Sequence, residues 1–180
     1  LRDLGQTQWI EAVHKLDNSQ LSSVVESLTG DKDAQNVLAA VFGNSPYLSQ
    51  TCISDPAILI EVLQQGPDSA ASNVFSRLDM FDTGLGDAQS VSRHLRVTKS
   101  QMALIIAIAD MGNLWPLAKI TQCLSDLAQK TLSKACSHVL QQAAAKGVIT
   151  LKHPDDPEKE SGYVVLGMGK LGSFELNFSS

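Results

Sequence analysis

The sequence is poor in cysteine, and its few cysteines do not form a disulfide framework. The 180 residues include three cysteines, Cys52, Cys123 and Cys136, and no two of them form a CxxC pair. Cys123 and Cys136 fall on one expected helix, where their separation of roughly 20 Å is too long for a disulfide. An odd number of cysteines without a framework is typical of a reducing compartment, so we expect a cytoplasmic protein.

Long apolar runs are also missing. The longest is MALIIAIA at residues 102–109, far shorter than the roughly 20 residues that a membrane-spanning helix needs. No secretory signal peptide is visible in the sequence. We therefore expect no membrane partner.

Positive charge is scarce. The chain has 14 lysines and arginines against 19 aspartates and glutamates, which gives a formal net charge of -5. A general nucleic-acid-binding protein usually presents a basic surface, so we expect no nucleic acid partner. The four histidines, His14, His94, His138 and His153, are scattered without metal-ligand spacing, and we interpret them as structural residues and expect no metal ligands among them.

The residues that are present predict a mainly α-helical protein. Apolar residues make up 43% of the chain, which is typical of a globular domain. Proline after a capping side chain, at Ser45-Pro46 and Asp55-Pro56, predicts two helix starts, and Gly66-Pro67 predicts a break. Helical spacing or helix-end signals mark the following segments: residues 5–16, 31–43, 46–54, 56–65, 68–81, 87–111 and 116–146.

The last two of these helices are long and are joined by the short turn GNLW. We expect them to form an antiparallel helical hairpin. The second half of the first one, residues 102–109, is apolar nearly all round. That pattern predicts the central buried helix of a bundle.

The pattern changes after residue 147. A charged loop, KHPDDPEKESG, leads into YVVLGMG, which is β-branched, apolar and bounded by glycines. This is typical of a buried strand. We therefore predict a helical region at 1–147 and the start of an α+β domain at 148–180. The loop's acidic residues could suggest metal ligands, but its two prolines and its lysine favour a solvated connector; they are Asp155, Asp156, Glu158 and Glu160.

The glycines that follow the predicted strand are the main candidate for chemistry. Gly167, Gly169 and Gly172 fit the spacing G-x-G-x-x-G, which lets a backbone turn sharply and approach a phosphate. The order of residues is not that of a Walker A loop, because Lys170 stands between the glycines. Taken alone, the spacing leaves two interpretations open, a phosphate-binding loop and a plain tight turn.

The wider stretch VVLGMGKLGSFELNFSS is more specific. It resembles the signature of the bifunctional glutamine synthetase adenylyltransferase/adenylyl-removing enzyme family, a branch of the nucleotidyltransferase superfamily. Its residue pattern resembles that of the N-terminal, adenylyl-removing half. One departure is Ser173, where the family commonly has a second glycine. The helical residues resemble the family more loosely. The matching positions are Gly167, Met168, Gly169, Lys170, Leu171, Gly172, Glu175, Leu176, Asn177, Ser179 and Ser180.

The resemblance implies a nucleotide site. In this superfamily a glycine-rich turn after the first strand holds nucleotide phosphates, and two carboxylates on the next strand bind Mg²⁺. It implies ATP or ADP and Mg²⁺ as ligands of the complete enzyme. The residues that it implies for phosphate binding are Gly167, Gly169, Lys170, Gly172, Ser173 and Ser180.

The resemblance also implies partners and a reaction. The adenylyltransferase half moves AMP from ATP onto a tyrosine of glutamine synthetase, and the adenylyl-removing half releases it as ADP by phosphorolysis. A PII-type signal protein sets the balance. The family's metal-binding aspartates would begin directly after Ser180, so no catalytic or metal-binding residue is expected within these 180 residues, and we expect the chain by itself to be inactive.

Two other functions are compatible with parts of the sequence. The long helices could form a non-catalytic docking or regulatory module in which the glycines make only a tight turn. A Rossmann dehydrogenase would need a helix after Gly172 and an acidic residue about 20 residues further on.

We also expect a last strand without sheet partners to be poorly ordered or to pair with another chain.

Overall fold

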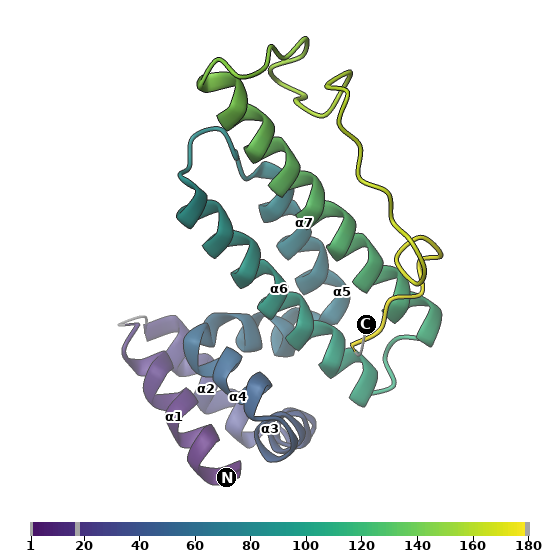
Figure 1. The fold of residues 1–180 in the computed structure, drawn as a ribbon. Helices are drawn as coiled ribbons and strands as arrows, with labels where there is room; N and C mark the ends of the chain where they lie inside the picture. Colours follow the sequence, from purple (N-terminus) through teal and green to yellow (C-terminus); the bar gives the residue numbers. More distant parts are fainter. Residues whose placement is uncertain (1, 17–18, 179–180) are drawn as a thin grey trace. The chain divides into compact units, whose positions relative to one another are not determined.

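The fold is described from a computed structural model, which describes residues 2–16 and 19–178. These residues are mainly α-helical, as predicted (Figure 1). No helix among them is long and apolar enough to cross a membrane. The helices are α1 (Arg2–His14), α2 (Ser19–Gly30), α3 (Lys32–Asn44), α4 (Pro46–Ser54), α5 (Pro56–Met80), α6 (Ala88–Met111) and α7 (Leu117–Ala145).

The strand predicted at residues 163–169 is not formed in the described part of the chain. A β-strand is stabilised by hydrogen bonds to a neighbouring strand, and residues 2–16 and 19–178 contain no second strand that could supply them. The apolar side chains are exposed instead of buried; Val164 is 72% exposed and Leu166 is 76% exposed. The α+β domain that should begin here stays a prediction.

The chain divides into two compact units. The first comprises residues 1–74 and 100–116, and the second comprises residues 75–99 and 117–180. Because α5 and α6 contribute residues to both units, each unit is described separately below. The predicted domain boundary between residues 147 and 148 rests on the sequence alone.

The core of the first unit is built around Trp9 of α1. Its side chain is 0% exposed, its ring lies 6.2 Å from that of Phe42 on α3, and its indole Nε1 donates a hydrogen bond to the carbonyl oxygen of Pro56 at 3.3 Å. The predicted buried helix is confirmed, since Met102 and Ile105 of α6 are also fully buried. Burial of these large apolar groups is the main force that stabilises the unit.

Capping side chains begin two helices of this unit where the sequence predicted starts. The carboxylate of Asp31 accepts a hydrogen bond from Ala34 N at 2.8 Å, and Ser45 Oγ accepts one from Leu48 N at 3.2 Å, next to Pro46. These bonds satisfy backbone donors that have no partner within the helix. Asp55, which precedes the predicted helix start at Pro56, has a partner from another helix. Its carboxylate accepts a hydrogen bond from Gln101 Nε2 of α6 at 2.6 Å.

The predicted break at Gly66-Pro67 is present as a sharp bend within α5. Gly66 has φ 79° and ψ 165°, a conformation that only glycine adopts readily. The bend lets Asn73 Nδ2 donate to Glu61 Oε1 at 2.8 Å. In a straight helix, residues twelve apart would be roughly 18 Å from each other. The hydrogen bond therefore requires the chain to fold back at Gly66.

We expect Gly66→Ala to destabilise the protein by about 1–3 kcal/mol, because alanine is strained at this φ and ψ. Urea unfolding followed by circular dichroism measures the loss. Gly43→Ala is the matched control, since Gly43 lies within α3 and a Cβ there meets nothing within 4 Å. The control should be neutral or slightly stabilising, and an equal loss in both variants would contradict the strain at Gly66.

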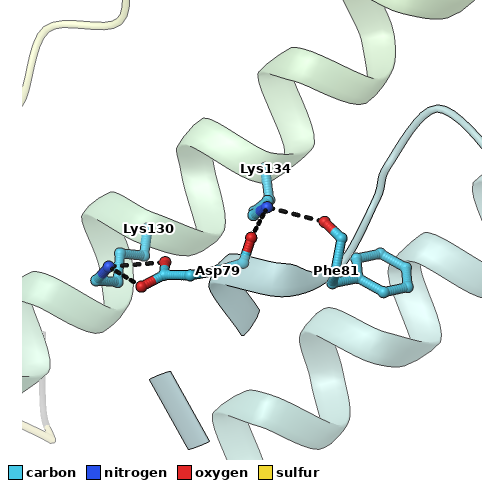
Figure 2. A network of polar contacts seen from close by, with 4 residues as sticks. All are labelled: Asp79, Phe81, Lys130 and Lys134. Atoms are coloured by element: carbon cyan, nitrogen blue, oxygen red, sulfur yellow. Dashed lines mark hydrogen bonds and ion pairs between the residues drawn. The ribbon is translucent and has the colours of Figure 1, made fainter. Parts of the chain in front are cut away.

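In the second unit, α7 holds the end of α5 through two lysines. Figure 2 shows Lys130 and Lys134 reaching the segment that contains Asp79 and Phe81. Lys130 Nζ pairs with the carboxylate of Asp79 at 2.7 Å, and Lys134 Nζ donates to the carbonyl oxygens of Asp79 and Phe81, each at 2.8 Å. The carbonyls at a helix end lack partners within the helix, so Lys134 supplies a cap from a distant part of the sequence.

Two further residues of α7 extend this contact. His138 is buried, and its Nδ1 lies 2.9 Å from the carbonyl oxygen of Thr83. Because a carbonyl can only accept, Nδ1 must carry the proton. The hydroxyl of Thr83 donates to Gln141 Oε1 at 2.9 Å. One face of α7 thus fixes the connection between α5 and α6, and with it the orientation of α7 within this unit.

His94 of α6 gives this region a dependence on pH. Its ring stacks on Phe81, with the ring centroids 3.8 Å apart. Burial, and secondarily the positive charge of Lys134, lower the pKa of His94 from its usual 6.5. As the pH falls below 6.5, the unfolded chain takes up this proton before the folded chain does, so the folded state loses stability.

We therefore expect the free energy of unfolding to fall as the pH drops below 6.5, and His94→Phe to remove part of that fall. Phenylalanine keeps a ring against Phe81 but cannot be protonated. Urea unfolding above and below this pH measures the difference. Identical pH dependence in the two proteins would contradict the assignment to His94.

Candidate functional site

The candidate site lies on the segment that follows α7. After a turn at Gly147, where φ is 70°, the chain passes through a loop and returns beside α7 (Figure 1). Near its end, Leu176 N donates to Ser125 Oγ of α7 at 3.4 Å. The end of the returning segment therefore lies against α7.

The glycine loop, Gly167–Ser173, is a closed turn within this segment. Ser173 N donates to Gly169 O at 3.0 Å, and Glu175 N donates to Lys170 O at 2.8 Å. Gly169 has φ 59°, in the left-handed region that favours glycine. No helix follows the loop up to residue 178. An anion bound here would therefore be held by the loop itself and not by the end of a helix.

Gly172 makes the closest approach in the loop. A Cβ built at this position would lie 2.6 Å from the carbonyl oxygen of Gly167, a backbone atom that cannot move aside by changing rotamer. Only glycine therefore allows the turn to close. Such close packing of backbone is what a loop needs if a phosphate is to approach its main chain.

Two polar side chains of the loop contact residues that follow it directly in the sequence. Lys170 is exposed, and its Nζ lies 3.4 Å from Asn177 Oδ1. The hydroxyl of Ser173 lies 3.1 Å from the carboxylate of Glu175. Lys170 remains at the surface, where it can contribute a positive charge to an anion at the loop.

Five of the six residues assigned to phosphate binding from the resemblance are thus brought together in one turn. They are Gly167, Gly169, Lys170, Gly172 and Ser173. The sixth, Ser180, lies outside the described residues. The sequence alone left open whether the glycines form a phosphate loop or a plain turn, and the closed geometry is compatible with both.

A cavity of about 510 Å³ lies between the glycine loop and α7. Gly167 and Gly172 line it from the loop, and Leu132 and Ser133 line it from α7. The cavity also has apolar walls from the returning segment, among them Tyr163 and Val165. It is large enough for part of a small organic ligand.

The interpretation of the acidic loop as a solvated connector is wrong for Glu158, which is held by two serines of α7. Glu158 lines the cavity and is half-buried, and its carboxylate accepts hydrogen bonds from Ser133 Oγ at 2.5 Å and Ser137 Oγ at 3.1 Å. Serines of a helix that lies far away in the sequence give no local signal of such a contact. The other acidic residues of the loop, Asp155, Asp156 and Glu160, are exposed, in line with a solvated connector.

Two cysteines have raised pKa values, which disfavours the thiolate form that a nucleophile needs. Burial, and secondarily the charge of Glu158, raise the pKa of Cys136, which lines the cavity. Burial also raises the pKa of Cys52 to about 12. A thiol with a raised pKa stays protonated at neutral pH and is a poor nucleophile; Cys52 is fully buried in the core of the first unit.

Metal ligands are not gathered at the site. In residues 2–16 and 19–178, no group of three histidine, cysteine, aspartate or glutamate side chains could hold a metal ion. Glu160 instead pairs with Lys152 at 3.0 Å. The residues assigned to phosphate binding are thus not accompanied by grouped metal ligands in this part of the chain, and no step proposed below passes through a metal.

Comparison with known proteins gives a consistent result. The family model described as glutamate-ammonia ligase adenylyltransferase matches residues 35–180. No solved structure matches the chain.

Several curated relatives carry the name bifunctional glutamine synthetase adenylyltransferase/adenylyl-removing enzyme. One from Rhodopseudomonas palustris CGA009 is 33% identical over 98% of this chain and 18% of its own length. Another, from Bradyrhizobium diazoefficiens, is 34% identical over 88% of this chain and 16% of its own length. A third, from Rhizobium meliloti 1021, is 37% identical over 87% of this chain and 16% of its own length. The chain thus spans less than a fifth of the length of these relatives.

Proposed function

The chain belongs to the glutamate-ammonia ligase adenylyltransferase family, and from this membership we propose that it forms part of an enzyme that adds AMP to glutamine synthetase and removes it. We assign the chain to the adenylyl-removing half, in which phosphate releases AMP from a tyrosine as ADP. The observation that supports this most directly is the glycine loop, where five of the residues assigned to phosphate binding lie in one closed turn.

In this proposal the glycine loop holds the phosphates of the nucleotide. The missing side chain at Gly172 keeps the turn closed, and Lys170 adds a positive charge at the surface of the loop. These groups bind and orient the phosphate, which lowers the entropic cost of the displacement.

The proposal extends to partners and location. Glutamine synthetase is the substrate protein, a PII-type signal protein is the regulator, and the cytoplasm is the location. We expect the 180-residue chain alone to release no ADP from adenylylated glutamine synthetase, because none of the residues that the resemblance assigns to this site is a metal-binding carboxylate. ADP release by the purified chain would overturn that expectation.

Titration with ATP tests the nucleotide site. We expect the full-length protein that contains this chain to bind ATP, and Lys170→Ala to weaken binding by about tenfold, because it removes one charge-assisted contact. Lys159→Ala is the matched control, since Lys159 is an exposed lysine outside the glycine loop. Failure of the full-length protein to bind ATP or ADP would contradict the proposal and favour a docking module with a structural turn.

A further inference from the structure

A chain of hydrogen bonds connects α7 to the start of the apolar segment before the glycine loop. The carboxylate of Glu158 accepts from Ser133 and Ser137 on α7. The carbonyl oxygen of Glu158 accepts from Ser161 Oγ at 3.0 Å, and Ser161 Oγ accepts from Tyr163 N at 3.1 Å. The position of Tyr163 is thus set from α7 through Glu158.

The other end of the segment is also attached to α7. Leu176 N donates to Ser125 Oγ, and Ser125 is fully buried and donates in turn to Thr121 O at 2.8 Å. The two attachments lie on either side of the glycine loop in the sequence. On α7, Ser125 and Ser133 are eight residues apart, or roughly 12 Å along the helix axis. The loop is therefore held at both ends on one rigid helix.

The attachment through Glu158 is the stronger of the two. Hydrogen bonds to an ionised carboxylate are roughly twice as strong as neutral ones, and the Ser133 bond is short, at 2.5 Å. The Leu176 bond is neutral and long, at 3.4 Å. Loss of Glu158 should therefore release the start of the segment while Ser125 still holds its end.

We propose that Glu158 is a positioning residue of the glycine loop: its carboxylate, held by Ser133 and Ser137, fixes where the loop lies along α7 and so where a phosphate is bound. This inference rests on the proposed function, because it assumes that the loop binds nucleotide. Glu158 touches no substrate in this account and acts only through the backbone that leads to Tyr163.

The test compares Glu158→Ala with Glu160→Ala in the full-length protein. Glu160 is two residues further along the same loop, is exposed, and is bonded to Lys152 and not to α7. Two quantities are measured for each variant: the rate of amide hydrogen exchange over residues 163–176, and the dissociation constant for ATP. We expect Glu158→Ala to accelerate exchange and to raise the dissociation constant by about tenfold, because the bonds from Ser133 and Ser137 no longer hold the start of the segment. The control should change neither.

A double-mutant cycle separates positioning from a general loss of structure. If Glu158 acts through Ser133, the effects of Glu158→Gln and Ser133→Ala on ATP binding should be clearly less than additive. Ser133→Ala combined with Glu160→Ala should behave additively.

The outcomes distinguish the two proposals. Unchanged hydrogen exchange in Glu158→Ala would show that Glu158 does not attach the segment to α7. Faster exchange with an unchanged dissociation constant for ATP would show that the attachment does not position the loop for binding. Additive effects of Glu158→Gln and Ser133→Ala also overturn the positioning role. Absence of ATP binding by the unaltered protein overturns the proposed function, whereas the exchange rates still report on the attachment.

Discussion

Gly172→Ala is expected to reduce phosphorolytic ADP release by the full-length protein by about a hundredfold, the loss that a misplacement of roughly 1 Å can cause. The added Cβ would lie 2.6 Å from the carbonyl oxygen of Gly167. Because both partners belong to the main chain, the collision can be relieved only by opening the turn. Opening it moves the backbone on which phosphate binding depends. Initial rates of ADP release measure the loss.

Gly169→Ala is the matched control for this substitution. Gly169 belongs to the same turn and has φ 59°, but a Cβ there meets nothing within 4 Å. Alanine at that position has the strain of the left-handed region without the collision, so the loss of activity should be clearly smaller. The helical circular dichroism of both variants should match that of the unaltered protein. Equal losses of activity would show that collision at Gly172 is not the cause.

Trp9→Ala is expected to have the largest effect on stability, a loss of about 3–5 kcal/mol, because it removes a fully buried aromatic side chain from the core of the first unit. It also removes the hydrogen bond from the indole to Pro56 O. Urea unfolding followed by circular dichroism measures the loss. Trp9→Phe keeps an aromatic ring near Phe42 but not this hydrogen bond. Its free energy of unfolding should lie between those of the unaltered protein and Trp9→Ala.

Leu4→Ala is the control in the same helix, since Leu4 is 60% exposed. It should change the free energy of unfolding by no more than about 0.5 kcal/mol, as surface substitutions usually do. A loss below about 1 kcal/mol in Trp9→Ala would contradict the core described for the first unit.

The sequence predicted local features well, because their causes are local. A capping side chain next to a proline predicted the start of α4 at Ser45-Pro46, and Gly66-Pro67 predicted the bend in α5. Continuous apolar residues predicted the buried part of α6. Each of these signals depends on residues that are neighbours along the chain.

The features that the sequence did not predict depend on distant residues. Lys134 caps carbonyls more than fifty positions away, and Glu158 is held by two serines of α7. Neither residue differs in type from the many exposed lysines and glutamates of the chain. Only the fold shows which of them has a partner.

The predicted strand failed for a related reason. Aromatic Tyr163 and β-branched Val164 and Val165 favour a strand, but a strand also needs a neighbour with which to pair. The family signature specifies the glycines individually, so the sequence located the glycine loop, and its binding of phosphate stays a prediction. The sequence could not predict the contacts that hold the loop on α7.

Release of ADP from adenylylated glutamine synthetase shows whether the glycine loop binds phosphate in an adenylyl-removing enzyme. Full-length protein, inorganic phosphate and magnesium are combined with the adenylylated substrate, and ADP is measured over time. The account predicts ADP release by the unaltered protein and its near-complete loss in Gly172→Ala. No ADP release by the unaltered protein, or undiminished release by Gly172→Ala, would contradict it.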